Sequence, residues 1–235
     1  METAKLGHLK LYGAGHASGG AYHHVSIKGE GVIGEGLSAA GCRIYGTGRF
    51  LGNAETERLK VLGESEFEGD LIAGKISIYG TMQIRGALHV GRLKLKGLTE
   101  IGGNMAGDLC EAKGKLSVKG DCEIESFHIT GCVDVTGLLN AGEIDIGLSH
   151  DDSQVREIGG TSITVKRRAS FFKRKKARLT AELIEGDKIY LEHTEAAAVR
   201  GKEVVIGPGC KIGTIEFENK CKCDQHSKVN KRIKL

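Results

Sequence analysis

Glycine recurs at every seventeenth position along most of this chain, and that spacing limits the folds that the chain can adopt. Two interleaved series of glycines keep the same period. A fixed period this short leaves no room for a helix in each repeat and indicates a solenoid of short strands. The first series is Gly29, Gly46, Gly63, Gly80, Gly97, Gly114 and Gly131, and the second is Gly52, Gly69, Gly86, Gly103, Gly120 and Gly137.

The apolar residues follow the same period. Within each repeat they alternate with polar residues, as in Leu93-Lys94-Leu95-Lys96, which is the pattern of a half-buried strand. The apolar pairs are offset by 6, 6 and 5 positions around one repeat, so three sides complete a turn. We therefore expect a triangular β-helix with the glycines at two of its corners, where a Cβ atom would force strain.

Two other folds fit these observations less well. Strands of a β-sandwich with regular turns do not keep so exact a period over seven units. The turns of the left-handed hexapeptide-repeat acyltransferases are built from strict sixes, whereas one side of this repeat is a residue shorter. The chain of 235 residues has no tryptophan and only 5% aromatic residues, which suits a narrow tube filled with small and branched side chains.

The period fails near residue 148, and this break divides the chain. The alternation at Ile163-Thr164-Val165 fits one further turn that is two residues longer, and apolar alternation resumes after a basic segment. We expect five parts: an N-terminal tail or cap at 1–24, a regular β-helix at 25–147, an interruption with a basic loop at 148–182, a second and less regular β-helical stack at 183–217, and a C-terminal tail at 218–235.

Strand–glycine units such as Ile76-Ser77-Ile78-Tyr79-Gly80 recur through the regular repeat, and the segments 185–192 and 199–210 are more specific than this repeat. In these features the chain resembles the bactofilins, the polymer-forming cytoskeletal proteins of bacteria, in their larger, two-part form. The resemblance implies a right-handed triangular β-helix that joins end to end into filaments without bound nucleotide. We expect a scaffolding role in which the protein itself is the partner, and a paralogue is a second candidate that the sequence does not decide.

Polymerisation is expected on physical grounds as well. The open strand edges of a solenoid template pairing with another chain unless they are capped. The candidates for the two end contacts are Val25, Ile27 and Ile33 near one end and Ile212, Ile215 and Phe217 near the other.

A basic segment between residues 166 and 178 is the strongest functional signal outside the repeat. Its eight cations exceed the net charge of +4 of the whole chain. Cations flanking two aromatic rings suit an anionic membrane surface; nucleic acid is a less favoured partner, and a solvated loop is the third possibility. The segment comprises Lys166, Arg167, Arg168, Phe171, Phe172, Lys173, Arg174, Lys175, Lys176 and Arg178.

The remaining residues give no sign of catalysis, a cofactor, a metal or a small-molecule substrate. Cys221, Cys223 and His226 offer three ligands, whereas structural zinc usually takes four, so we interpret them as part of a polar tail. The other cysteines include inward-facing members of the apolar columns, and the first residues show no signal peptide. We therefore expect a cytoplasmic, non-enzymatic protein, peripheral at the inner membrane.

Two functions remain open. One is the filament-forming scaffold. The other is a monomeric β-helical adaptor that binds partner proteins or nucleic acid, with Tyr45, Leu62 and Tyr79 stacked in one outward column as a contact stripe.

Overall fold

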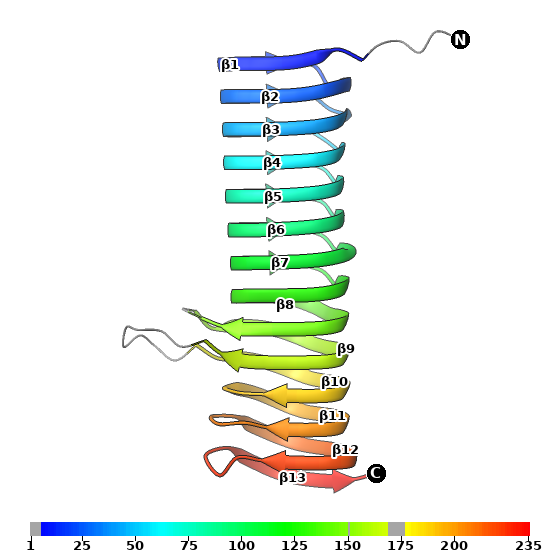
Figure 1. Ribbon diagram of the computed structural model, residues 1–235, viewed down its shortest axis with the longest axis vertical. Coiled ribbons are helices and arrows are strands. Elements are labelled where there is room, and N and C mark those ends of the chain that lie inside the picture. Colours follow the sequence, from blue (N-terminus) through cyan, green and yellow to red (C-terminus); the bar gives the residue numbers. More distant parts are fainter. Residues whose placement is uncertain (1–5, 150, 169–176) are drawn as a thin grey trace, which may run out of the picture. The chain divides into compact units, whose positions relative to one another are not determined.

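Strands are the only regular elements in the part of the chain that the structure describes. The computed structural model describes residues 6–149, 151–168 and 177–235, and these contain the thirteen strands labelled in Figure 1. No helix of the described residues is long and apolar enough to cross a membrane. The chain divides into two compact units, Met1–Gly107 and Asp108–Leu235.

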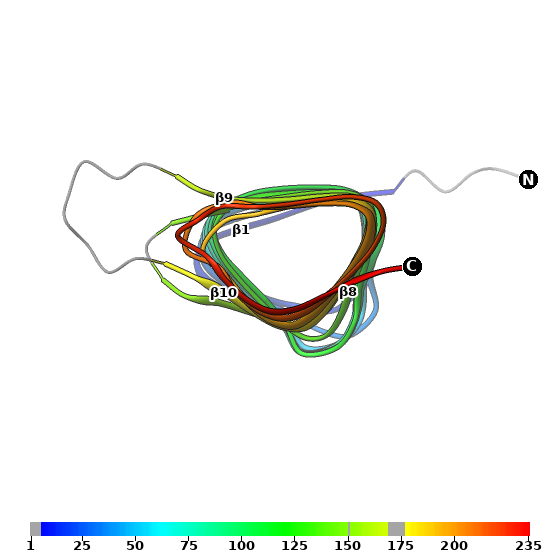
Figure 2. The same cartoon turned by 90° about the horizontal axis from the view of Figure 1, so that it is seen from below.

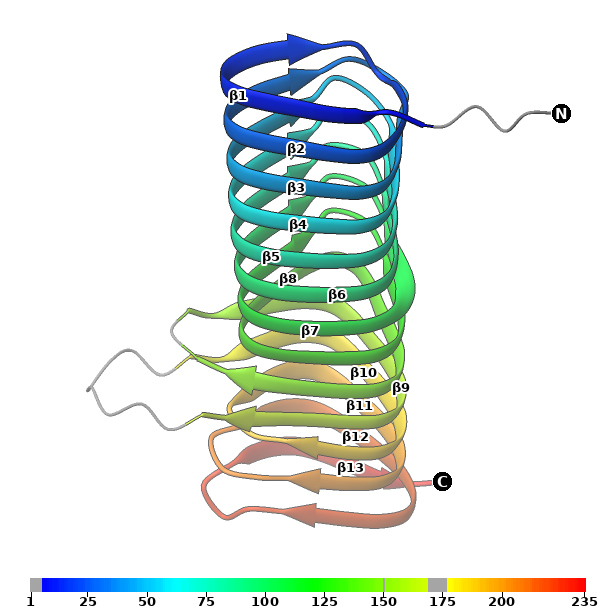
Figure 3. The same ribbon diagram turned by 45° about the horizontal axis from the view of Figure 1, so that its top comes forward.

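The first unit is a regular β-helix, in which each turn is called a coil here. Neighbouring strands pair in parallel, and from β2 onward the register keeps the period of the glycines, as in Ile44 opposite Val61 and Val61 opposite Ile78. The coils are three-sided and right-handed (Figures 2 and 3). The expected fold is therefore confirmed. The strands are β1 (His8–Ala17), β2 (Gly20–Ile33), β3 (Leu37–Phe50), β4 (Ala54–Phe67), β5 (Leu71–Ile84), β6 (Leu88–Ile101) and the start of β7 (Met105–Val118).

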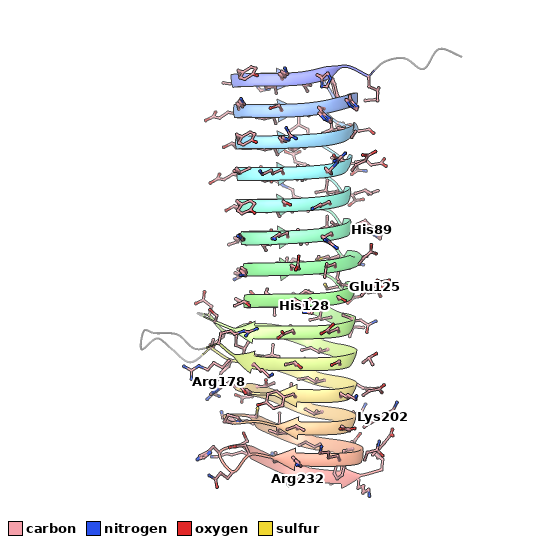
Figure 4. The ribbon with its side chains drawn as sticks, viewed as in Figure 1. His89, Glu125, His128, Arg178, Lys202 and Arg232 are labelled. Atoms are coloured by element: carbon pink, nitrogen blue, oxygen red, sulfur yellow. The ribbon has the colours of Figure 1, made fainter. Side chains whose placement is uncertain are left out.

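The core of the first unit consists of stacked apolar columns. Ile44, Val61 and Ile78 are fully buried in one column, and the rings of Phe50 and Phe67 stack in another with centroids 4.3 Å apart. Outward side chains, such as that of His89, project from the coils (Figure 4). Alternation along the strand thus separates an apolar interior from a polar surface.

Glycine is required at the first corner for two reasons. Gly46 and Gly63 have φ values of 117° and 128°, in a region that residues with a Cβ atom rarely adopt. A Cβ atom on Gly63 would also lie 2.2 Å from the carbonyl oxygen of Gly46, one coil earlier. Each glycine of this series therefore allows the next coil to approach closely enough to pair.

Glycine at the second corner makes room for a polar ladder. The Oδ1 atom of Asn53 accepts a hydrogen bond from the backbone N–H of Asp70 (2.8 Å), and the Oδ1 atom of Asp70 accepts one from Ala87 (2.7 Å). A Cβ atom on Gly69 or Gly86 would lie 2.2 Å from these same oxygens. The second glycine series therefore leaves space for side chains that satisfy backbone donors at the corner.

The second unit is also β-helical, but its coils vary in length. Ile144 lies opposite Ile163, a coil two residues longer than the regular one, as the sequence predicted. Ile184 lies opposite Val199, a coil two residues shorter than the regular one. The expected less regular stack is thus confirmed. The strands are the rest of β7, β8 (Cys122–Leu148), β9 (Ser153–Arg167), β10 (Leu179–Leu191), β11 (Thr194–Ile206), β12 (Lys211–Cys223) and β13 (Lys228–Lys234).

Three of the expected boundaries need correction. The segment 1–24 contains β1 and the start of β2, because Leu9-Lys10-Leu11-Tyr12-Gly13 repeats the strand–glycine unit one residue out of register. The interruption at 148–182 contains all of β9 and the start of β10, and the expected tail at 218–235 contains the end of β12 and all of β13. Strands therefore extend almost to both ends of the chain.

Burial predicts opposite effects for two substitutions in neighbouring coils. Ile78 is fully buried between Val61 and Leu95, so Ile78→Asp would place an unpaired carboxylate in an apolar stack. We expect it to lower the free energy of unfolding by at least about 4 kcal/mol. The outward Lys94→Asp should change that free energy by no more than about 0.5 kcal/mol. Denaturant melts of both variants measure this, and similar midpoints would contradict the assignment of the two faces.

Candidate functional site

The first candidate site is the edge strand β1 of the first unit. Among the described residues, β1 pairs with β2 and with no other strand. Leu9 lies opposite Val25 and Leu11 opposite Ile27, so both leucines continue the inward columns. They are half-buried, whereas Val25 and Ile27 are 1% and 0% exposed. The end of the apolar stack is therefore formed by Leu9 and Leu11.

The predicted contact residues at this end lie one coil too far in. Val25, Ile27 and Ile33 are all buried beneath β1, so they are not available for a contact with another molecule. The sequence signal for β1 was present in Leu9, Leu11 and Gly13, the last with a φ of 70°. It was missed because the coil from β1 to β2 is one residue shorter than the regular coil, which places Gly13 opposite Gly29.

The second candidate site is the edge strand β13 of the second unit. It covers the first half of β12, with Val229 opposite Ile212 and Arg232 opposite Ile215. Ile212 and Ile215 are consequently buried, and Phe217, opposite Lys234, is half-buried. The contact predicted for Ile212, Ile215 and Phe217 is therefore corrected in the same way: the edge lies one strand further along the chain.

The second half of β12 has no strand of β13 across it, and two cysteines lie there. Cys221 and Cys223 are half-buried, with Sγ atoms 3.9 Å apart. Burial is the main cause that raises the pKa of Cys221 to about 11, and the neighbouring Cys223 adds to the rise. This thiol therefore stays protonated at neutral pH. His226 instead places Nδ1 3.0 Å from the Asp224 carboxylate.

No metal centre emerges from these groups. Among residues 6–149, 151–168 and 177–235, no three His, Cys, Asp or Glu side chains are arranged to hold a metal ion. The inward cysteines are also unsuited to thiolate chemistry, because burial raises the pKa values of Cys42 and Cys122 to about 12. These thiols pack as small apolar side chains.

The third candidate site is the basic segment, of which the structure describes the two ends. Lys166 places Nζ 5.2 Å from the ring centroid of Tyr190, and the backbone N–H of Arg167 donates to Glu192. Arg168 lies 3.9 Å from the carboxylate of Asp145. The other six residues, which lie outside the described part, are Phe171, Phe172, Lys173, Arg174, Lys175 and Lys176.

Arg178 anchors the far end of the basic segment. Its backbone N–H donates to Asp152 Oδ1 (3.1 Å), and its Nη1 lies 3.5 Å from Glu195 Oε2. The side chain of Arg178 is labelled in Figure 4. Three of the four described cations thus contact acidic residues or an aromatic ring through their side chains, with Arg167 contributing a backbone contact. The predicted anion-binding charge therefore depends chiefly on Lys173, Arg174, Lys175 and Lys176.

Comparison with known proteins identifies two relatives. The chain is 76% identical over 235 residues to the uncharacterized protein YhbF of Bacillus subtilis (strain 168), covering all of both chains. It is 42% identical over 105 residues to the uncharacterized protein YhbE of the same organism, covering 43% of this chain and 44% of YhbE. No protein-family model matches the chain, and no solved structure matches it.

The basic segment gives a prediction that tests the membrane hypothesis. Replacing Lys173, Arg174, Lys175 and Lys176 with glutamate, called the loop variant below, should abolish flotation with anionic vesicles. Flotation of the unmodified protein should weaken as added salt shortens the screening length from its physiological value of about 8 Å. Flotation that persists in the loop variant would exclude this segment as the membrane contact.

The two aromatic residues provide the control for this experiment. Phe171→Ala with Phe172→Ala should weaken flotation while leaving its salt dependence unchanged, because the rings would supply the apolar part of binding. Loss of salt dependence in this double variant would contradict the division of roles between cations and rings.

Proposed function

We propose that this chain, which belongs to the family of the Bacillus subtilis protein YhbF, is a non-enzymatic scaffold that assembles end to end through its edge strands. Assembly would need no bound nucleotide, as in the bactofilins that the sequence resembles. The basic segment would hold the assembly at the inner face of the membrane. A paralogue could take part through the same kind of edge.

The observation that carries the proposal is the composition of the β1 edge. Inward positions in this strand hold Leu9 and Leu11, which are half-buried and lie directly above fully buried residues. Solenoid proteins that stay monomeric close such an end with a polar cap. Among the described residues, the strand that ends the stack is itself apolar on its inward face, which favours a further coil from another molecule.

The backbone supports the same conclusion. An edge strand has N–H and C=O groups on one side that lack a strand partner. A second molecule placed about 4.8 Å away, the spacing between paired strands, would satisfy these groups. Strand pairing and apolar stacking would therefore be gained in one contact.

Two edges in one chain favour extended assemblies over dimers. In the part of the chain that the structure describes, β1 and β13 each have one strand partner. If β1 contacts β13 of another molecule, the contact is heterologous, and it repeats from molecule to molecule unless it closes into a ring. If instead β1 contacts β1 of another molecule, β13 of each molecule remains available for a second contact. The assembly can therefore still grow.

The edge leucines provide the test. Leu9→Glu with Leu11→Glu places two carboxylates in the proposed junction and should convert large assemblies into small species with unchanged strand content. The matched control is Ala14→Glu with His16→Glu, which adds two carboxylates at exposed positions of the same strand. Sedimentation velocity over a concentration series measures the size of the species.

Two sedimentation results would contradict the proposal. If both double variants sediment as the unmodified protein does, Leu9 and Leu11 do not form the junction. If the unmodified protein remains a monomer at every concentration, the adaptor function becomes the better account. Thermal melts of both variants show whether the remaining coils stay folded.

A further inference from the structure

Outward side chains on one side of the first unit form three rows that run across six strands. The strand registers define the rows, from β1 to β6. We call this surface the basic face. Its rows are His8, His24, Gly41, Arg58, Lys75 and Arg92; Lys10, Ser26, Arg43, Lys60, Ser77 and Lys94; and Tyr12, Lys28, Tyr45, Leu62, Tyr79 and Lys96.

Charge is strongly segregated onto this face. Residues 6–107 contain eleven Lys and Arg residues and nine Asp and Glu residues. Nine of the eleven cations lie in the three rows, and none of the nine acids does. The other two cations, Arg49 and Arg85, lie outside the rows and bind Glu68 and Glu66.

The cations of the basic face are left largely uncompensated. Among the described residues, Arg58 alone of the nine lies within 4.0 Å of a carboxylate, at 3.9 Å from Glu57. Both of these side chains are more than 70% exposed, so water screens the pair. A surface of one sign with so little internal neutralisation attracts a polyanion.

Aromatic side chains accompany the cations in the third row. Tyr12, Tyr45 and Tyr79 are 63%, 39% and 41% exposed. Lys28 places Nζ 5.6 Å from the ring centroid of Tyr12, and Lys96 places Nζ 5.3 Å from that of Tyr79. The rings are therefore held on the surface beside cations, with part of each ring accessible.

The basic face is also hollowed. A groove of about 830 Å³ extends over β1 to β5 and is lined by residues of all three rows. Small residues at Ser26, Gly41 and Ser77 line it together with larger cations and the rings of Tyr12 and Tyr45. A groove of this kind accommodates a flexible chain better than the flat surface of a bilayer.

We propose that the basic face binds single-stranded nucleic acid. Its lysines and arginines would neutralise phosphates, and bases would stack on the accessible tyrosine rings, the two features that sequence-independent single-strand sites combine. A membrane is less favoured, because Leu62 is the only aliphatic residue in the three rows and offers little apolar area for insertion. Duplex is less favoured because its paired bases cannot stack on the rings.

Charge reversal on the face provides the first test. The face variant replaces Arg43, Lys60, Lys75 and Lys94, all exposed, with glutamate. The loop variant is its matched control, because it reverses four cations as well. Fluorescence anisotropy with a labelled oligothymidylate of 20 nucleotides should show at least a hundredfold loss of affinity for the face variant and less than threefold for the loop variant.

Salt dependence adds an independent readout. For single strands the logarithm of affinity falls with that of salt by about 0.7 per phosphate contact. Removing four contacts should therefore reduce the slope by about 3 in the face variant and leave it unchanged in the loop variant. Equal losses in both variants would overturn the proposal, since they would show that net charge alone drives binding.

The tyrosines test the stacking part. Tyr45→Ala with Tyr79→Ala should weaken oligonucleotide binding by at least roughly thirtyfold without changing the salt slope, and phenylalanine at both positions should restore it. Failure of phenylalanine to restore binding would overturn the stacking role.

Other anionic partners give distinguishable results. Tighter binding of duplex than of single strands would overturn the proposal in its stated form. Flotation with anionic vesicles, without any oligonucleotide binding, would also overturn it if the face variant loses this flotation and the loop variant keeps it. A change in sedimentation of the face variant alone, without oligonucleotide binding, would overturn it too and identify the face as a contact between copies.

Discussion

The close approach of successive coils at a glycine corner is the constraint on which the first unit depends. Each glycine there has a positive φ and lies against the carbonyl group of the glycine one coil earlier. One such residue per coil fixes the register, and the register in turn stacks inward side chains in columns and outward side chains in rows. The buried core and the basic face are two consequences of the same spacing.

In the second unit the glycine corner ends, and the coil length is no longer constant. Positive-φ glycine continues at Gly114 and Gly131, and after that the coils differ in length. The coils are still closed by parallel pairing of apolar strands. Variation in coil length also allows an insertion, since β9 and β10 pair across the basic segment, with Ser153 opposite Leu179.

The sequence predicts what repeats and misses what departs from the repeat. Periodicity alone predicted the inward columns, the parallel coils and the longer coil that pairs Ile163 with Ile144. It did not predict β1, where one residue is missing from the coil, or β13, which lacks the strand–glycine unit. The predicted end contacts were therefore placed one coil too far in, at residues that the terminal strands bury.

The basic face was missed for a different reason. Along the chain, the cations of the basic segment are contiguous, whereas residues 6–107 contain nearly equal numbers of cations and acids. In three dimensions the positions one period apart come together, and cations spread along the chain from Lys10 to Lys96 meet on one surface. Outward positions between the apolar columns carried this signal, because Lys and Arg recur there and acids do not.

Edges and face would serve separate purposes. Assembly would use the backbone edge of β1 and β13 and the exposed ends of the apolar columns. The basic face lies on outward side chains, perpendicular to the pairing direction, and would stay accessible in an assembled form. Each molecule of such a scaffold would then present the basic face of its own first unit.

Hydrogen exchange at the edge strands tests the central claim most directly. If molecules assemble by strand pairing, amide exchange in His8–Ala17 and Lys228–Lys234 should slow as protein concentration rises, while exchange in a central strand such as Leu71–Ile84 stays the same. Assemblies that form without any slowing in either edge strand would contradict the account.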